Sequence, residues 1–268
     1  MTSTRLDSLL FEKRLAESRS MAQRLIMAGQ VRVDGQVIIK PAHKVNPDVQ
    51  ITISQGPKFV SRGGEKLEAA LIAFNRTSMS GKVCADVGAS TGGFSDCLLQ
   101  YGAVKIFAID VGYGILHWKL RNDPRIVVME RTNARDLSSL PEIPDLITVD
   151  TSFISLKIIL PVVKKWFFDQ SGEVIALIKP QFEAGKKDAA RGEGVIRDPI
   201  IHKRVLVDVL TAAEDIGFGV NGLIQSPLKG PKGNIEFLVF LCLPKAVESQ
   251  SQQLIEKLFP SENESTYD

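Results

Sequence analysis

Hydrophobic residues follow two different patterns along the chain, and the change between them divides the sequence into two parts. In the first 60 residues the apolar positions form short groups, and Leu6, Leu9 and Leu10 recur at the spacing of a helix over 5–15. From residue 83 onward, short apolar runs alternate with longer amphipathic stretches. That alternation predicts an α/β domain with a largely parallel sheet covered by helices.

The first part has the signals of two helices followed by a hairpin. A second helix is expected over 19–28, with Ser18 or Ser20 as its N-cap. The stretch VRVDGQVI then predicts two short strands joined by a tight turn at Asp34-Gly35. Residues 1–60 are therefore expected to form a small α+β domain.

The second part contains buried strands that end in charged residues. The run VCADV is followed by the glycine-rich loop GASTGG and an apolar helix, which is the arrangement of a nucleotide-type site. The later runs VKIFAI, LITV and EVIALI end at Asp110, Asp150 and Lys179. Ligands of open α/β sheets bind at the carboxyl ends of strands, so these side chains are candidates for one site. The polar, glycine-rich stretch 181–198 is long for a loop, which favours a functional lid.

The glycine loop does not fit two common fingerprints. A GxGxxG pattern that starts at Gly88 needs glycine at position 90, where Ser90 stands. A GxxxxGK[ST] pattern needs lysine at position 94, where Phe94 stands. Both mismatches argue against a dinucleotide dehydrogenase and a P-loop NTPase. Asp110 is placed to accept both ribose hydroxyls of a nucleoside cofactor.

Composition and charge narrow the class of protein. No apolar run approaches the roughly 20 residues that span a bilayer, and the charged N-terminal stretch is not expected to act as a signal peptide, which favours a cytoplasmic protein. The three cysteines form no CxxC motif, so no metal site is expected. Through Gly64 the chain has ten Lys and Arg against five Asp and Glu, a net +5, which leaves −3 for the remainder of a chain of total charge +2. A basic module joined to an acidic domain suggests binding of a polyanion, although a solvated basic face would look the same.

Four ionisable residues have unusual local contexts: Lys66 in SRGGEKL, Asp150 in TVDTSFISL, Lys179 in LIKPQFEAG and Glu236 in KGPKGNIEFL. Two amines and two carboxylates beside a cofactor loop could activate a weakly acidic hydroxyl for group transfer. Taken one at a time, each would be expected to form an ordinary surface ion pair.

These contexts, in this order, resemble the TlyA family, historically labelled haemolysins, and match the Lys-Asp-Lys-Glu tetrad of FtsJ-like 2′-O-methyltransferases. The resemblance implies a Rossmann-like methyltransferase domain that uses S-adenosylmethionine to methylate the ribose 2′-hydroxyl of ribosomal RNA, at cytidine, with ribosomal RNA or ribosomal subunits as partners and no membrane. It implies the catalytic set Lys66, Asp150, Lys179 and Glu236. The implied cofactor contacts are Asp86, Gly88, Ala89, Ser90, Thr91, Gly92, Gly93, Phe94, Asp110, Asn133, Ala134 and Arg135.

The N-terminal stretches RLDSLL, SRSMAQRLIMAGQVRVDG and KPAHKV resemble the RNA-binding domain named after ribosomal protein S-four, also called the αL motif. This domain lacks aromatic side chains for stacking, which favours recognition of RNA by backbone and shape. The implied RNA contacts are Arg5, Arg19, Ser20, Gln23 and Arg24, with Arg62 added from the basic segment that follows.

The expected organisation is an S-four-like domain over 1–60, a linker and first helix over 61–82, a methyltransferase domain over 83–246 and a tail over 247–268.

Two positions depart from the family pattern: Thr151 replaces an apolar residue, and the stretch GEGVIRD has fewer glycines than expected. Two other functions stay open. One is an RNA-binding ribosome-assembly factor with a degenerate methyltransferase domain, and the other is a membrane-active haemolysin.

Overall fold

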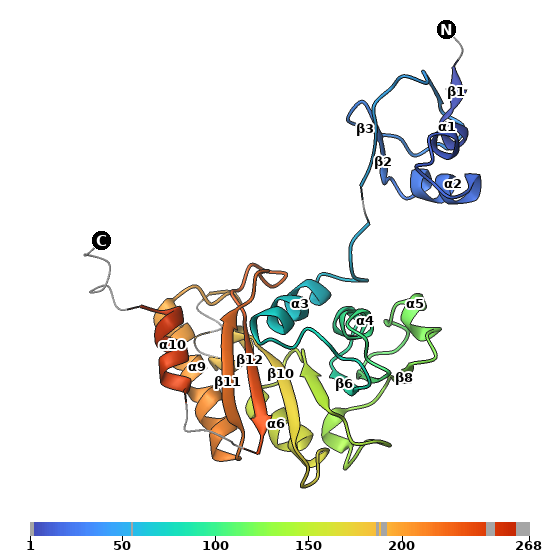
Figure 1. The fold of residues 1–268 in the computed structure, drawn as a ribbon. Helices are drawn as coiled ribbons and strands as arrows, with labels where there is room; N and C mark the ends of the chain where they lie inside the picture. The colour runs from blue at the N-terminus through green and yellow to red at the C-terminus, as the bar shows by residue number, and fades with distance from the viewer. Residues whose placement is uncertain (1–2, 55, 186–187, 189–191, 245–249, 261–268) are drawn as a thin grey trace. The chain divides into compact units, whose positions relative to one another are not determined.

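The computed structural model describes residues 3–54, 56–185, 188, 192–244 and 250–260, and the chain forms two units, Met1–Lys58 and Phe59–Asp268 (Figure 1). Each unit has its own hydrophobic core. The expected α/β fold with a small N-terminal α+β domain is confirmed. The polar end of the predicted tail, 261–268, and positions 186–187 and 189–191 of the predicted lid lie outside the described residues.

The N-terminal unit contains two helices and two small antiparallel sheets. Its elements are β1 (Thr4–Arg5), α1 (Leu6–Glu12), α2 (Arg19–Met27), β2 (Val31–Val33), β3 (Gln36–Val37), β4 (Lys44–Val45) and β5 (Ile51–Ile53). The side chain of Ser18 caps α2 by accepting a hydrogen bond from Met21 N at 3.1 Å. Asp34 and Gly35 both have positive φ, at 48° and 83°, as a two-residue hairpin turn of this hand requires.

The second unit is built on a seven-stranded sheet in the order β11-β12-β10-β9-β6-β7-β8. Strands β6 (Val83–Val87), β7 (Lys105–Ile109), β8 (Ile126–Met129), β9 (Leu146–Val149) and β10 (Gly172–Ile178) are parallel. Strand β12 (Phe237–Leu243) lies antiparallel between β10 and β11 (Gly219–Gln225). The chain runs outward from β6 to β8 and then returns to β9, so strand order reverses between β6 and β9. Open α/β sheets bind ligands at such a reversal.

Helices cover both faces of this sheet (Figure 1). One face packs against α3 (Gly63–Ala73), α4 (Gly93–Gln100) and α5 (Trp118–Arg121). The other packs against α6 (Leu156–Lys165), α9 (Pro199–Asp215) and α10 (Ser251–Leu258). Alternate residues of β6 enter different clusters, since Cys84 belongs to the first face and Ala85 to the second. This two-sided burial explains why β6 is apolar except at Asp86.

Three segments differ from the sequence-based expectation. Helix α1 ends at Glu12, and Arg14 adopts a positive φ of 56°. The stretch 181–198 was expected to be an irregular lid, but its first residues belong to a short helix, α7 (Pro180–Glu183). Proline suits the first position of a helix because its missing N–H would have no partner there. Helix α10 lies within the expected tail, yet its Ile255 is buried in the core of the second unit.

Candidate active site

The loops that follow β6 and β9 meet at the point where strand order reverses. Gly88 has φ +85°, and a Cβ placed on it would lie 2.6 Å from the carbonyl oxygen of Asp150. Only glycine therefore allows the two backbones to approach this closely. The contact fixes the glycine loop against the segment that carries Asp150, and it places two adjoining pockets at the carboxyl edge of the sheet.

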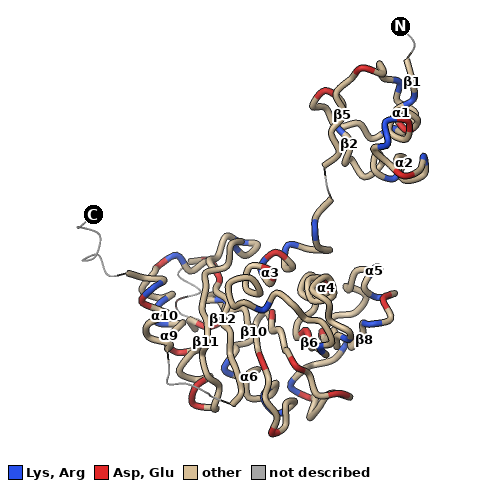
Figure 2. Tube along the Cα trace, viewed as in Figure 1, with Lys and Arg blue, Asp and Glu red and all other residues tan. Residues whose placement is uncertain are grey.

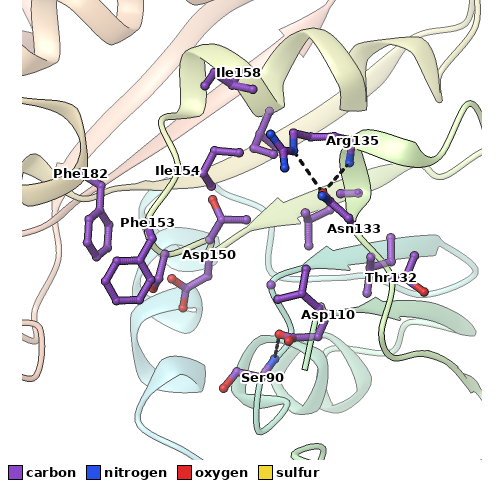
Figure 3. A pocket seen from close by; sticks show the side chains of 18 of the residues that line it. Ser90, Asp110, Thr132, Asn133, Arg135, Asp150, Phe153, Ile154, Ile158 and Phe182 are labelled. Atoms are coloured by element: carbon purple, nitrogen blue, oxygen red, sulfur yellow. Dashed lines mark hydrogen bonds between the residues drawn. The ribbon is translucent and has the colours of Figure 1, made fainter. Parts of the chain in front are cut away.

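The first pocket is a cavity of about 670 Å³ between the loops that follow β6, β7, β8 and β9 (Figure 3). Asp110 marks one side, where its Oδ2 accepts a hydrogen bond from Ser90 N at 2.8 Å and its Oδ1 accepts one from Gly112 N at 2.7 Å. Each carboxylate oxygen retains a further lone pair. The opposite wall includes the apolar side chains of Ile154 and Ile158.

These features fit a nucleoside cofactor. A fixed carboxylate with free lone pairs can accept ribose hydroxyls, and an apolar wall can contact an adenine ring. Asn133 lies in the same pocket, where its Oδ1 accepts Arg135 N at 3.1 Å and caps the short helix η1 (Ala134–Asp136). S-adenosylmethionine carries both a ribose and an adenine ring, so the residues that line this cavity suit it.

Most of the predicted cofactor contacts line one of the two pockets. Ten of them do so: Gly88, Ala89, Ser90, Thr91, Gly93, Phe94, Asp110, Asn133, Ala134 and Arg135. Gly92 and Asp86 line neither. Gly92 is the left-handed N-cap of α4 at φ +94° and faces Leu116 and Leu120.

Asp86 is wholly buried beneath the glycine loop, so its side chain does not reach the pockets. It accepts hydrogen bonds from Ser95 Oγ at 2.6 Å and from Thr148 Oγ1 at 3.1 Å. Burial raises the pKa of Asp86 to about 6, and the two hydroxyl donors act in the opposite direction. Its position ties β6 to α4 and to β9 and thereby supports the loop above.

The second pocket is a cavity of about 270 Å³ that brings together all four residues of the predicted tetrad. They form two ion pairs: Lys66 Nζ lies 2.6 Å from Glu236 Oε2, and Lys179 Nζ lies 2.6 Å from Asp150 Oδ1. The first contact is also a hydrogen bond, whereas the angles of the second do not suit one. Lys179 Nζ instead donates a hydrogen bond to the hydroxyl of Ser152, at 3.0 Å.

Helix α7 links the tetrad to the loop after β9 through residues that the sequence reasoning missed. Gln181 Nε2 donates to Glu236 Oε1 at 3.3 Å. Glu183 accepts hydrogen bonds from the Ser155 hydroxyl and the Leu156 N–H, and burial raises its pKa. The short helix therefore holds Glu236 on one side and the start of α6 on the other. The motif KPQFE was noted in the sequence, but these partners depend on the tertiary fold.

The loop after Asp150 also presents an aromatic side chain that sequence reasoning did not select. Phe153 is 90% exposed with φ +65°, and its ring centroid lies 4.9 Å from that of Phe182 (Figure 3). Both rings line the first pocket beside Asp150.

In the N-terminal unit, three of the predicted RNA contacts converge on a buried carboxylate. Asp7 is fully buried; it accepts hydrogen bonds from Arg5 and from Gln23 Nε2, and Arg19 lies 3.6 Å away. Hydrogen bonding from Arg5 lowers the pKa of Asp7. Ser20 and Arg24 are exposed on α2, while Arg62 belongs to the second unit and lines the tetrad pocket. Asp7 therefore orients basic side chains whose outer faces are open to solvent.

Comparison with known proteins agrees with both units. The FtsJ-like methyltransferase family matches residues 59–243, and the S4 domain matches residues 4–51. No helix among the described residues is long and apolar enough to cross a membrane.

Relatives that align with most of this chain are named either as rRNA methyltransferases or as hemolysins. The 16S/23S rRNA (cytidine-2′-O)-methyltransferase TlyA of Mycobacterium tuberculosis is 44% identical over 88% of this chain and 89% of its own length. Hemolysin A of Brachyspira hyodysenteriae is 45% identical over 87% of this chain and 98% of its own length.

A solved structure of a hemolysin-labelled protein from Streptococcus thermophilus is 40% identical, covers 96% of both chains and has a TM-score of 0.70. Family model, full-length relatives and solved structure agree with one another. The chain therefore belongs to the TlyA family, and in it an S4 domain is joined to an FtsJ-like methyltransferase domain.

Proposed function

We propose that this protein transfers a methyl group from S-adenosylmethionine to the ribose 2′-hydroxyl of a cytidine in ribosomal RNA. The observation that carries the proposal is the convergence of Lys66, Asp150, Lys179 and Glu236 on one pocket that adjoins the nucleoside-sized cavity. The M. tuberculosis and Campylobacter jejuni relatives named as rRNA (cytidine-2′-O)-methyltransferases are 44% and 33% identical to this chain, which supports the same reaction here.

The cofactor would occupy the larger cavity, held by the glycine loop at Gly88, by Asp110 and by Asn133. When bound, it supplies an electrophilic methyl group on a sulfonium. The residues of the chain must then orient the acceptor hydroxyl and take up its proton, because a ribose 2′-hydroxyl is a weak acid.

We assign to Lys179 the role of accepting the proton of the 2′-hydroxyl. Its amine, once neutral, would be placed to accept the proton of the 2′-hydroxyl, while the bound cofactor would supply the methyl group. Asp150, at 2.6 Å, and Ser152, at 3.0 Å, hold that amine in place. The Lys66–Glu236 pair closes the other side of the pocket, and Gln181 orients Glu236.

The S4 domain would deliver the RNA. The sequence through Gly64 carries a net charge of +5, and α2 contributes Arg19 and Arg24. Figure 2 marks the Lys and Arg positions of the chain in blue. Phosphate contacts by Lys and Arg supply most of the affinity for structured RNA without selecting a sequence. Capture of RNA in the N-terminal unit and chemistry in the second unit is the division of labour that we propose.

Mapping of ribose methylation across ribosomal RNA from cells with and without this gene tests the proposal. One or more cytidines should lose 2′-O-methylation in the deletion and regain it with the parent gene but not with Lys179→Ala. Purified enzyme should also transfer label from the cofactor to ribosomal subunits of the deletion strain. If the protein restores subunit assembly in the deletion strain but transfers no methyl group, it would be an assembly factor instead. If the purified protein makes liposomes leak, it would be a haemolysin.

A further inference from the structure

The tetrad pocket contains two cations that the ion pairs leave uncompensated. Four basic side chains line it: Lys66, Lys179, Arg62 and Lys229. Lys66 and Lys179 are neutralised by Glu236 and Asp150. Arg62 and Lys229 are exposed, and neither forms an ion pair with a carboxylate in the described part of the chain. The pocket therefore carries an excess of two positive charges, although the sequence after Gly64 is net acidic.

The position of Lys229 next to the tetrad is imposed by close backbone packing. A Cβ on the adjacent Gly230 would lie 2.5 Å from Glu236 Oε1, so the chain beside Lys229 passes directly over the tetrad carboxylate. The same loop is closed by the Gly230 N–H, which donates to the Asn234 carbonyl at 2.9 Å. Asn234 is buried and fastens the loop further, as its side chain bonds to Ile196 N and to the Gly194 carbonyl, both at 2.9 Å. Lys229 thus projects from a fixed loop.

The chemistry of the acceptor supplies a ligand for these cations. In an internal nucleotide of RNA, the carbon that bears the 2′-hydroxyl is bonded to the carbon whose oxygen carries the next phosphodiester. A 2′-hydroxyl cannot reach Lys179 without that anion entering the same small pocket. Lys66 and Lys179 are already paired with carboxylates, which leaves Arg62 and Lys229 to meet the phosphate.

We propose that Lys229, together with Arg62, binds the RNA phosphodiester adjacent to the target ribose and so sets the 2′-hydroxyl against Lys179. This inference rests on the proposed methyl transfer to RNA. The uncapped N-terminus of α3, which begins directly after Arg62, adds partial positive charge to the same side. The other anion that could enter the pocket is the carboxylate of the cofactor, because the glycine loop and the start of α4 also line it.

The chain offers a matched control, Lys232. It lies three residues away on the same loop, is equally exposed and forms no ion pair in the described structure, but it lines a separate cavity with Arg197 instead of the tetrad pocket. Single-turnover methylation of ribosomal subunits from the deletion strain should be measured for the parent, Lys229→Ala, Lys229→Arg and Lys232→Ala over a range of salt concentrations.

At an enzyme concentration below saturation, Lys229→Ala should lower the single-turnover rate by about tenfold, because one hydrogen bond between charged groups is lost. It should also reduce the slope of log rate against log salt by about 1. Lys229→Arg should stay within a few-fold of the parent because it keeps the charge, and Lys232→Ala should keep the parent slope. Thermal unfolding of all three variants should match that of the parent.

Three results would overturn the inference. One is an unchanged rate and salt slope in Lys229→Ala. Another is an equal loss in Lys232→Ala, which would indicate diffuse surface charge. The third is weaker binding of S-adenosylmethionine by Lys229→Ala in calorimetry without RNA, which would assign the lysine to the cofactor carboxylate. Failure of the parent enzyme to methylate any ribosomal RNA would instead remove the proposed function itself.

Discussion

The two halves of the active site use different kinds of polar group. Around the cofactor cavity, contacts depend on backbone: the Ser90 and Gly112 N–H groups fix Asp110, and Gly88 permits close approach of two loops. In the tetrad pocket they depend on ionised side chains, and Lys66 and Glu236 are 170 positions apart in the chain. Backbone contacts are formed once the sheet is in place, whereas side-chain pairs can be broken one residue at a time. Substitutions should therefore act on the two halves in different ways.

The largest effect is expected at Lys179. Lys179→Ala removes the group to which we assign the orientation of the hydroxyl and the acceptance of its proton, and Lys179→Arg keeps the charge but cannot be deprotonated. Loss of a positioned acid–base group costs about 10²–10⁴ in rate. Both variants should bind cofactor and RNA almost normally and turn over at least about a hundredfold more slowly in single-turnover assays. A Lys179→Ala enzyme within a few-fold of the parent would move the proton acceptor to Asp150 or a bound water.

The second effect concerns stability and separates the two ion pairs. Glu236 is 1% exposed and Lys66 11%, so Glu236→Ala would leave a buried ammonium without a partner. Breaking a buried pair in this way costs about 3–5 kcal/mol of unfolding free energy. Asp150 is 24% exposed, and Asp150→Ala leaves Lys179 its hydrogen bond to the Ser152 hydroxyl at 3.0 Å, so this variant should cost clearly less in denaturant titration, even though both variants lose activity. Equal losses of unfolding free energy in Glu236→Ala and Asp150→Ala would contradict this difference between the two ion pairs.

A smaller effect is expected in the backbone-built half. Asp110→Ala should weaken binding of S-adenosylmethionine by about 1–3 kcal/mol, because cofactor hydroxyls would be buried without a partner. The rate at saturating cofactor should change little, since Asp110 lies away from the tetrad pocket. Calorimetry gives the affinity, and an unchanged value would place the ribose elsewhere in the cavity.

The smallest effect on catalysis is expected at Asp86. Its folded-state pKa, about 6, is above the ordinary value of 3.8, so the folded protein binds the proton more tightly than the unfolded chain. Its contribution to stability is therefore greatest at acidic pH and declines as pH rises from about 4 to about 6. Asp86→Asn should flatten this part of the stability curve and keep cofactor affinity near that of the parent. A large loss of affinity would restore Asp86 as a cofactor contact.

The sequence predicts well those site residues, in both halves, that follow parallel strands, because their position depends on strand order. Asp110, Asp150 and Lys179 each follow a buried parallel strand, and parallel strands bring their carboxyl ends to one edge. The direction of a side chain within a strand is harder to predict. Asp86 precedes the glycine loop by two positions, but the pleat of β6 directs its carboxylate into the protein toward Ser95.

The other residues of the side-chain half were less predictable from physical reasoning alone. Glu236 precedes an antiparallel strand, so no rule for strand ends brings it to Lys66, and its assignment depended on the family resemblance. Exposed loop residues such as Phe153 and Lys229 follow no periodic pattern, and their proximity to the tetrad exists only in the folded chain. Helix α7 was not expected, because a proline that follows a strand can also begin a helix.

The placement of β12 between β10 and β11 has a consequence for the biosynthesis of the enzyme. Of the described strands, β12 is made last, yet it fills an interior position of the sheet and leads directly from Glu236. Strand β11 emerges from the ribosome earlier and has no neighbour in the sheet until β12 arrives. During translation the cofactor cavity, whose lining is complete by Phe182, can form well before the tetrad does. A nascent chain would thus pass through a stage at which it can hold the cofactor but cannot yet transfer the methyl group.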